Sequence, residues 1–466
     1  MQAVRYVGRG ITCNEAYREY LNSNDTAIVD SISPQRNVTI AFSRDGRPLS
    51  VPLRPHIRDL FHLAAATYIL DELVSRSDSE DGWTRDIELY YPVSDPQLWG
   101  TMEQTLGSML RTLTGDRFSF TWDIYPALPR NPLHRTALPR GFDAVCLFSG
   151  GLDSFIGAYR LLADGLKVIL AGHDADGKTA PAQTEMASYL MNMFPGQVTL
   201  VQCWVARSRV RKPRYVLPEK AENSHRIRSF LFLSIAVAVS TATGTPTIVI
   251  PENGLISLNS PLQRSRLGTL STRTAYPLFL SQFQDLVTGL DAFRGRIFNP
   301  YLYMSKTDMV NEIDDAIRPY AWRTLSCAHI ENLRWQGRNQ ARQCGYCVAC
   351  IYRRLAMLGA GLDVERDYID DVFRDLSSLS ATKQADMRAI VQFACKVTRS
   401  SVLERQMMVV SHGMFPPEIG EAIGPHASSD YSPWADMLLR WAEDCLAKVR
   451  EIGSAETIEM LRPYLG

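Results

Sequence analysis

The feature that most restricts the fold of this chain is the alternation of short apolar runs with helical patterns between residues 144 and 250. Continuous apolar runs of this length are typical of strands buried on both faces. Strands are predicted at 144–148, 167–171, 198–204 and 247–250, and helices at 153–163, 181–194 and 222–243. Such strands alternating with helices indicate an α/β fold with a doubly wound parallel sheet, which binds ligands at the carboxyl ends of its strands.

The remaining sequence divides by composition and periodicity. Alternating apolar residues at 38–42 and 118–124 predict half-buried strands, and residues 57–68 keep helical spacing. After residue 361 the pattern is mainly helical, with one apolar helix face between Trp434 and Cys445. The predicted units are an N-terminal α+β accessory domain (1–125), a Pro-rich linker (126–140), a core (141–325), a cysteine-rich segment (326–360) and a C-terminal helical region (361–466).

The composition narrows the class of protein. Among 466 residues there are 50 Lys plus Arg and 50 Asp plus Glu, so zero net charge argues against a protein that coats nucleic acid. The longest apolar run, 230–242, is too short to span a bilayer, and the N-terminus lacks the apolar core of a signal peptide. We expect a soluble, cytoplasmic protein, with no membrane partner and no indication of nucleic-acid binding.

Two candidate phosphate-binding loops lie within residues 147–179. The second, Gly172–Thr179, fits the Walker A spacing, but Asp174 and Asp176 would repel a triphosphate inside the cradle. No convincing Walker B strand follows it. We interpret it as a polar loop at the end of the second strand, on the side of the sheet where ligands bind.

The first loop, Ser149-Gly150-Gly151-Leu152-Asp153-Ser154, fits phosphate binding better. Its two glycines permit a tight turn and close approach of an anion, and the helix that follows presents the positive end of its dipole. Asp153 could help to hold Mg²⁺ or water, or it could cap the helix.

A cluster of cysteines gives the strongest metal signal. Cys327, Cys344, Cys347 and Cys350 fall within 24 residues and could complete a closed, tetrahedral Zn²⁺ site of structural type. An iron–sulfur cluster, a redox pair, a cysteine-lined core and a site in which His329 replaces one cysteine are the alternatives.

The S-G-G-x-D-S loop resembles the pyrophosphate-binding loop of the ATP pyrophosphatase (PP-loop, HUP-like) family. With Ser326-Cys327 and C-G-x-C-x-x-C at 344–350, it resembles more specifically the 7-cyano-7-deazaguanine synthase (QueC) family of queuosine biosynthesis. The stretches 228–234 and 305–308 also resemble QueC elements, so the resemblance covers roughly residues 143–355. Residues 251–277 depart from QueC, and together with the N-terminal domain and the length they resemble the QueC-like QatC proteins of Qat anti-phage defence systems.

The resemblance implies an ATP-dependent C–N ligase with ATP, Mg²⁺ and Zn²⁺ as cofactors. Such an enzyme would adenylate the carboxylate of a 7-deazaguanine-type small molecule, release pyrophosphate and AMP, and join the product to an amine. Asp153, Lys306 and Arg228 are the candidate catalytic residues, the loop 149–154 would bind the nucleotide, and Glu252 and Asn253 could read a guanine-like edge. The plainer alternatives are a surface lysine at 306, a solvated helix start at Arg226 and Arg228, and a simple turn at 252–253.

Three functions remain in competition. The first is the ligase just described, whose amine substrate could be ammonia or could belong to a partner protein of a defence operon, which would then be modified. A PP-loop enzyme of the tRNA-thiolation type would instead use Cys344 and Cys347 to carry sulfur. A non-catalytic nucleotide-binding subunit of a defence complex is the third possibility.

Overall fold

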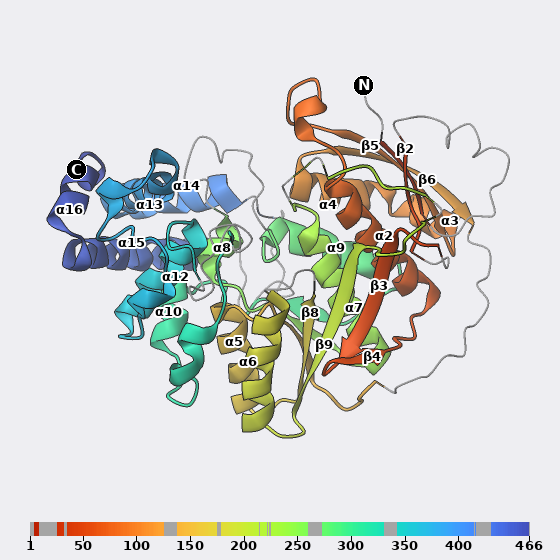
Figure 1. Ribbon diagram of the computed structural model, residues 1–466, viewed down its shortest axis with the longest axis horizontal. Helices are drawn as coiled ribbons and strands as arrows, with labels where there is room; N and C mark the ends of the chain where they lie inside the picture. Colours follow the sequence, from red (N-terminus) through yellow and green to blue (C-terminus); the bar gives the residue numbers. More distant parts are fainter. Residues whose placement is uncertain are drawn as a thin grey trace.

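The computed structural model describes residues 4–8, 26–31, 35–124, 138–174, 179–213, 215–220, 222, 225–259, 273–329, 343–413, 415 and 430–465. Most of the predicted linker, residues 175–178 of the Walker-like loop and residues 260–272 therefore lie outside the described residues. The described chain has a central seven-stranded sheet, flanked at one end by the N-terminal elements and at the other by C-terminal helices (Figure 1).

The central sheet has the strand order β11-β10-β7-β8-β9-β3-β4. Its strands are β3 (Val38–Arg44), β4 (Arg47–Leu49), β7 (Ala144–Leu147), β8 (Val168–His173), β9 (Val198–Arg207), β10 (Thr247–Val249) and β11 (Arg296–Phe298). The five strands from β7 to β11 run parallel, and β3 and β4 extend the sheet as antiparallel strands at the β9 edge. The sheet is thus mostly parallel, as the apolar runs predicted.

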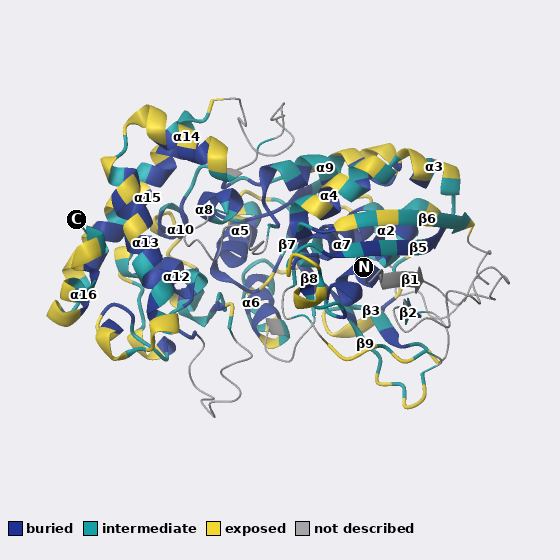
Figure 2. Cartoon of the chain, turned by 90° about the horizontal axis from the view of Figure 1, so that it is seen from above, coloured by how far each residue is buried: buried dark blue, intermediate teal, exposed yellow. Residues whose placement is uncertain are grey.

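Both faces of this sheet are covered, which confirms a doubly wound arrangement. Val145 of β7 belongs to the apolar core that includes helix α7 (Arg228–Thr243), whereas its neighbour Cys146 belongs to the core that includes α5 (Leu152–Ala163) and α6 (Thr179–Met193). Adjacent residues of a strand point to opposite faces, so the helices lie on both sides of the sheet. Figure 2 shows α5 and α7 buried at the centre, while α3 and α16 expose much of their surface.

Counted among the parallel strands alone, the order is 3-2-1-4-5, and it reverses between β7 and β10. In open α/β sheets, ligands bind outside the carboxyl ends of the strands at such a reversal.

Helix α7 is shorter than the helix predicted at 222–243, since it begins at Arg228.

The N-terminal region differs from the α+β arrangement that we predicted. Strands β1 (Val4–Gly8), β2 (Thr26–Val29), β5 (Asp86–Val93) and β6 (Arg117–Ile124) form an entirely parallel sheet of order β2-β1-β5-β6. Parallel neighbours need crossover connections, and between β5 and β6 helices α3 (Pro96–Thr101) and α4 (Glu103–Thr114) supply one. The predicted strand at 38–42 is β3, and it pairs with β9 rather than with this N-terminal sheet.

The structure describes further helices around these two sheets. They are α2 (Pro55–Asp71), α8 (Gly254–Leu258), α9 (Pro277–Gly289), α10 (Lys306–Asn311), α12 (Val348–Gly359), α13 (Ala381–Arg399), α14 (Val402–Gly413), α15 (Ser432–Ile452) and α16 (Ala455–Leu465), with 3₁₀ turns at Arg76–Asp78, Arg318–Arg323, Glu365–Asp367 and Leu376–Ser378. The predicted apolar face of α15 is buried. In the part of the chain that the structure describes, no helix combines the length and the apolar character needed to cross a membrane.

Candidate functional site

The loop that follows β7 turns sharply at Gly150. This residue has φ +76°, and a Cβ added to it would lie 2.7 Å from the backbone N of Gln183 and 2.9 Å from the carbonyl carbon of Ala182. Both atoms belong to the backbone of α6, so a side-chain rotation could not relieve the clash. The position therefore requires glycine both for its backbone angle and for its close approach to α6.

Hydroxyl groups gather around the turn at the start of α5. Ser149 Oγ lies 3.3 Å from Ser154 Oγ and accepts a hydrogen bond of the same length from the Gly151 N–H. Ser154 in turn donates to the Gly151 carbonyl at 3.0 Å. Gly151 is the N-cap of α5 and offers no side-chain acceptor, so the first N–H groups of the helix are left for other partners.

Asp153 does not cap the helix. Its Oδ2 accepts a 2.6 Å hydrogen bond from Asn253 Nδ2, and its Oδ1 accepts from the Lys306 ammonium group. All three side chains are buried, which excludes the interpretation of Lys306 as a surface lysine. Three segments that are far apart in the sequence therefore meet at one buried carboxylate.

Local structure fixes the position of Lys306. It is the first residue of α10, behind a capping box in which the Ser305 hydroxyl accepts from the Asp308 N–H and the Asp308 carboxylate accepts from the Ser305 N–H. A reciprocal cap of this kind fixes the first turn of a helix. Lys306 thus brings one positive charge to the carboxylate that follows the loop.

A cavity opens beside the loop, at the reversal point of the sheet. Its polar lining includes Ser149, Ser154, Gln183, Arg228, Glu252 and Thr274, and its apolar lining includes Phe148, Phe232 and Ile235. The Arg228 guanidinium carbon lies 5.4 Å from the centroid of the Phe232 ring. The cavity thus combines apolar walls with a few converging polar groups, which is the usual character of a small-molecule site.

Glu252 is the titratable group of this cavity whose pKa is most displaced. Burial, followed by the negative charge of Asp153, raises the pKa of Glu252 to about 7, although Lys306 and Arg228 oppose the shift. The Glu252 carbonyl accepts a 2.6 Å hydrogen bond from Asn299 Nδ2, which fixes the backbone at the end of β10.

Asn253 is placed differently from Glu252. It is fully buried, its Nδ2 donates to Asp153, and its Oδ1 accepts from the Ile256 N–H as the N-cap of α8. Both ends of the amide are thus engaged within the protein. Its predicted contact with a substrate stays a prediction, whereas its role in fixing Asp153 is visible in the structure.

The second loop begins inside a strand. Gly172 and His173 belong to β8 and pair with Gln202 and Cys203 of β9. A Walker A loop begins where its strand has ended, so this pairing agrees with our interpretation of a polar loop. His173 nevertheless lines the cavity wall.

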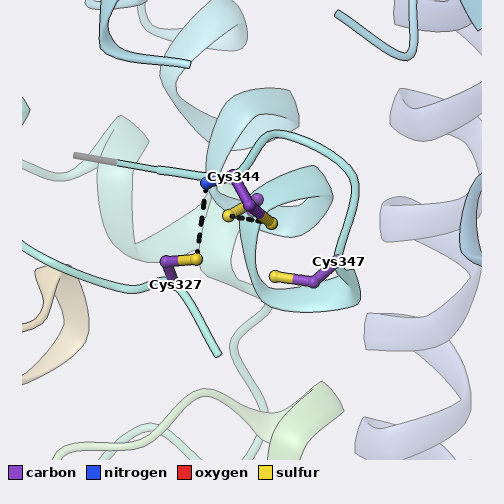
Figure 3. A group of neighbouring side chains, drawn as sticks. Cys327, Cys344 and Cys347 are labelled. Atoms are coloured by element: carbon purple, nitrogen blue, oxygen red, sulfur yellow. Dashed lines mark hydrogen bonds between the residues drawn. The ribbon is translucent and has the colours of Figure 1, made fainter. Parts of the chain in front are cut away.

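The four predicted cysteines come together. Their sulfur atoms lie within 4.8 Å of one another, and all four residues are buried (Figure 3). A tetrahedron with Zn–S bonds of about 2.3 Å separates its sulfurs by about 3.8 Å, and Cys344 Sγ lies 3.7 Å from Cys350 Sγ. The cluster therefore fits a metal ion such as zinc, and among the described residues it is the one group of three or more potential ligands.

The turn within the cluster depends on Gly345. This glycine has φ +89°, and a Cβ would lie 1.9 Å from the carbonyl oxygen of Asp370. Its backbone therefore makes the tight turn that places Cys344 and Cys347 on the same centre.

Sequence reasoning missed two contributors. Gln183 of α6 lines the cavity, accepts from Gln202 Nε2 at 3.0 Å, and donates to the His173 carbonyl at 3.2 Å. Ser326 accepts a 3.4 Å hydrogen bond from the Leu152 N–H. No local pattern marks Gln183, whereas Ser326 stands in the Ser326-Cys327 pair that we compared with QueC, although we assigned it no contact with the loop.

Comparison with known proteins does not assign the chain to a family. No protein-family model matches the chain, and no curated protein matches it significantly.

Proposed function

We propose that this chain is a QueC-like, PP-loop ATP-dependent C–N ligase. It would adenylate the carboxylate of a 7-deazaguanine-type substrate, release pyrophosphate and AMP, and join the acyl group to an amine. The observation that carries the proposal is the S-G-G-L-D-S loop at the reversal point of the sheet, with Lys306 held at its Asp153 and Arg228 in the adjoining cavity.

The loop suits an anion for physical reasons. Gly150 and Gly151 present backbone without Cβ atoms, and the start of α5, which has no side-chain cap from its N-cap residue, adds the positive end of the helix dipole. Arg228 can form paired hydrogen bonds to phosphate oxygens, whereas Lys306 acts as a fixed point charge. Groups placed before the reaction stabilise charge that builds on the departing pyrophosphate.

The proposed reaction has two steps. A carboxylate oxygen of the substrate attacks the α-phosphorus of ATP, the bond from that phosphorus to the bridging α–β oxygen breaks, and pyrophosphate leaves with the electron pair. An amine then attacks the acyl carbon, AMP leaves, and the nitrogen loses one proton to solvent. The first step needs no general base, because the attacking carboxylate is already ionised.

The cavity lining suits a flat, polar heterocycle. Phe148, Phe232 and Ile235 provide apolar surface, and Glu252 provides a carboxylate at the wall. When ionised, that carboxylate can accept hydrogen bonds from the N–H groups on a guanine-like edge.

We predicted that Asp153 could help to hold Mg²⁺, but the hydrogen bonds of its carboxylate leave little room for a metal ion. Each carboxylate oxygen of Asp153 already accepts a hydrogen bond, from Lys306 or from Asn253. We expect Mg²⁺ to be bound mainly by the phosphate oxygens of ATP, where it would neutralise charge, and Asp153 to act by fixing Lys306.

The cysteine cluster has a structural role in this proposal. Four buried thiolates leave a tetrahedral metal no open position for substrate. The burial of Cys344 and Cys347 also disfavours the tRNA-thiolation alternative, in which these thiols must reach an RNA substrate.

The direct test is to incubate the full chain with Mg-ATP, 7-carboxy-7-deazaguanine and ammonium, and to identify products by mass spectrometry. AMP and pyrophosphate that form only with the deazaguanine support the proposal. ADP and phosphate would refute it, and so would the absence of turnover with every deazaguanine carboxylate and amine offered. The matched variants are Asp153→Asn, which should abolish AMP formation, and Asp164→Asn, an exposed change at the other end of α5 that should not.

The amine acceptor needs a separate experiment. Co-expression with the protein encoded beside this chain, followed by intact-mass measurement, would detect a deazaguanine–protein amide. A mass increase that disappears with Asp153→Asn supports modification of a partner in a defence system. An unchanged partner mass in both cases restricts the acceptor to a small amine.

A further inference from the structure

A short segment, residues 324–327, touches the phosphate loop directly. The Leu325 N–H donates to the Gly150 carbonyl at 3.0 Å, and the Leu152 N–H donates to Ser326 Oγ at 3.4 Å. A Cβ added to Gly151 would lie 3.3 Å from the Leu325 carbonyl oxygen. The loop therefore rests against this segment as well as against α6.

The same segment is held by the cysteine cluster. Cys327 Sγ accepts from the Cys344 N–H at 3.4 Å, and Gln343, the residue before Cys344, donates through Nε2 to the Thr324 carbonyl at 3.0 Å. Arg353 of α12, the helix that starts within the cluster, donates to Thr324 Oγ1 at 2.5 Å. Each end of the segment is thus fixed by a residue that is a candidate metal ligand or lies close to one.

Bound metal would make these positions rigid. Thiolates in a closed zinc site are held at fixed bond lengths, and the free energy of metal binding contributes directly to local folding. Without metal, the four buried thiol groups have no common partner, and the segment loses the anchor at Cys327. Ser326, which accepts the hydrogen bond from the start of α5, directly precedes Cys327 in the chain.

We propose that metal binding at the cysteine cluster and nucleotide binding at the 149–154 loop are thermodynamically coupled through residues 324–327, with Ser326 as the positioning residue. The inference rests on the proposed function for its ligand, ATP. Coupling of two binding equilibria is reciprocal, so metal strengthens nucleotide binding by the factor by which nucleotide strengthens metal binding. Factors of about 5 to 150 are typical of such coupling.

The first test follows the loop without any nucleotide. Amide hydrogen exchange is measured in peptides that cover 149–155, in the zinc-loaded full chain, the zinc-depleted chain and zinc-loaded Ser326→Ala. We expect the Leu152 amide to exchange faster in the zinc-depleted chain and in Ser326→Ala than in the zinc-loaded wild type, because its hydrogen bond to Ser326 is weakened or lost. If zinc depletion unfolds the whole chain, Ser326→Ala, which leaves all four cysteines in place, decides the comparison.

The second test measures Mg-ATP affinity by calorimetry in variants that carry one zinc per chain. We expect Ser326→Ala to weaken binding by about fivefold or more, and Ser326→Thr, which keeps the hydroxyl, to restore it. Ser188→Ala is the matched control, because that hydroxyl donates to the Thr184 carbonyl one turn earlier in α6. Zinc affinity, measured by competition with a chelator, should rise on addition of Mg-ATP in the wild type and not in Ser326→Ala.

The two ideas fail in different ways. Loop exchange that is the same in all three samples would overturn the coupling, whether or not ATP binds. Wild-type ATP affinity in Ser326→Ala would overturn it as well. If the zinc-loaded wild-type chain binds no ATP while exchange responds to zinc, the proposed function fails and the structural coupling of cluster and loop stands.

Discussion

Replacement of Gly150 by alanine tests most directly whether the 149–154 loop is built to bring its backbone close to α6. The substitution has two costs. The left-handed backbone, φ +76°, costs a residue with a Cβ about 1–2 kcal/mol. The new methyl group would also lie 2.7 Å from the Gln183 backbone nitrogen, and such overpacking typically costs about 1–3 kcal/mol. We therefore expect Gly150→Ala to reduce the free energy of unfolding by about 2–5 kcal/mol.

Gly165 provides a control at the opposite end of the same helix. It has φ +84°, but a Cβ there would have no atom within 4 Å, so Gly165→Ala should cost only the backbone contribution of about 1–2 kcal/mol. Urea unfolding gives the stability of both variants, and calorimetry gives their Mg-ATP affinity. Only Gly150→Ala should lose ATP binding, because relief of its clash must move the loop or α6. Equal stability losses and unchanged ATP affinity in both variants would refute the reasoning.

Three other predictions concern charge and metal. Asp116→Asn removes the charge that pairs with the buried Arg76 and Arg85, and it should lower the free energy of unfolding in urea by about 3–5 kcal/mol. Asp86→Asn breaks only the exposed pair with Arg117 and should lower it by at most about 1 kcal/mol. Equal losses in the two variants would contradict the prediction. Glu252 has its pKa raised in the folded state from 4.5 to about 7, so its contribution to stability is greatest below pH 4.5 and is lost as the pH rises to about 7. The measured quantity is the melting temperature of Glu252→Gln minus that of the wild type. We expect this difference to be larger at pH 8, where the wild-type carboxylate is ionised, than at pH 4.5. A difference that does not change with pH would count against the burial of this carboxylate. Cys350→Ser should lower the zinc content, measured by elemental analysis, from about one per chain to near zero, whereas Cys395→Ser should not; full zinc content in Cys350→Ser would exclude the four-cysteine site.

The parts of the fold that could be predicted are those with a local cause. The strand of residues 144–147 and the helix after it have apolar periodicities that do not depend on the rest of the chain. The cysteine cluster was also predictable, because Cys344, Cys347 and Cys350 are close in sequence and require only a tight turn at Gly345 to meet.

The parts that could not be predicted depend on contacts between distant segments. β3 has the alternating pattern of a half-buried strand, which does not identify its partner, and its antiparallel pairing with β9 links residues more than 150 positions apart. In the same way, the interpretation of Lys306 as a surface lysine was excluded only once the structure placed it against Asp153. A pattern in one segment indicates which face is buried, but not which segment covers it.

The start of α7 shows why the N-terminal region belongs to the site. We predicted that this helix begins at residue 222, yet it begins at Arg228, where the Ile227 N–H donates to the Asp71 carboxylate at 3.1 Å. Arg226 is not a solvated residue, because its guanidinium stacks at 4.3 Å over the Trp83 ring. Residues before position 125 therefore contact the start of this helix, next to the Arg228 that lines the cavity.

Tyr68 of α2 extends this contact to the cavity wall. Its ring packs edge to face against His173 at 5.3 Å, and His173 lines the cavity at the end of β8. The N-terminal region thus supports the site in three ways. Its strands β3 and β4 belong to the central sheet, its Asp71 accepts a hydrogen bond at the start of α7, and its Tyr68 packs against the cavity wall at His173. A core of residues 141–325 alone would lack all three, so the activity proposed for this chain requires the N-terminal region even though no residue in it is placed among the reacting groups.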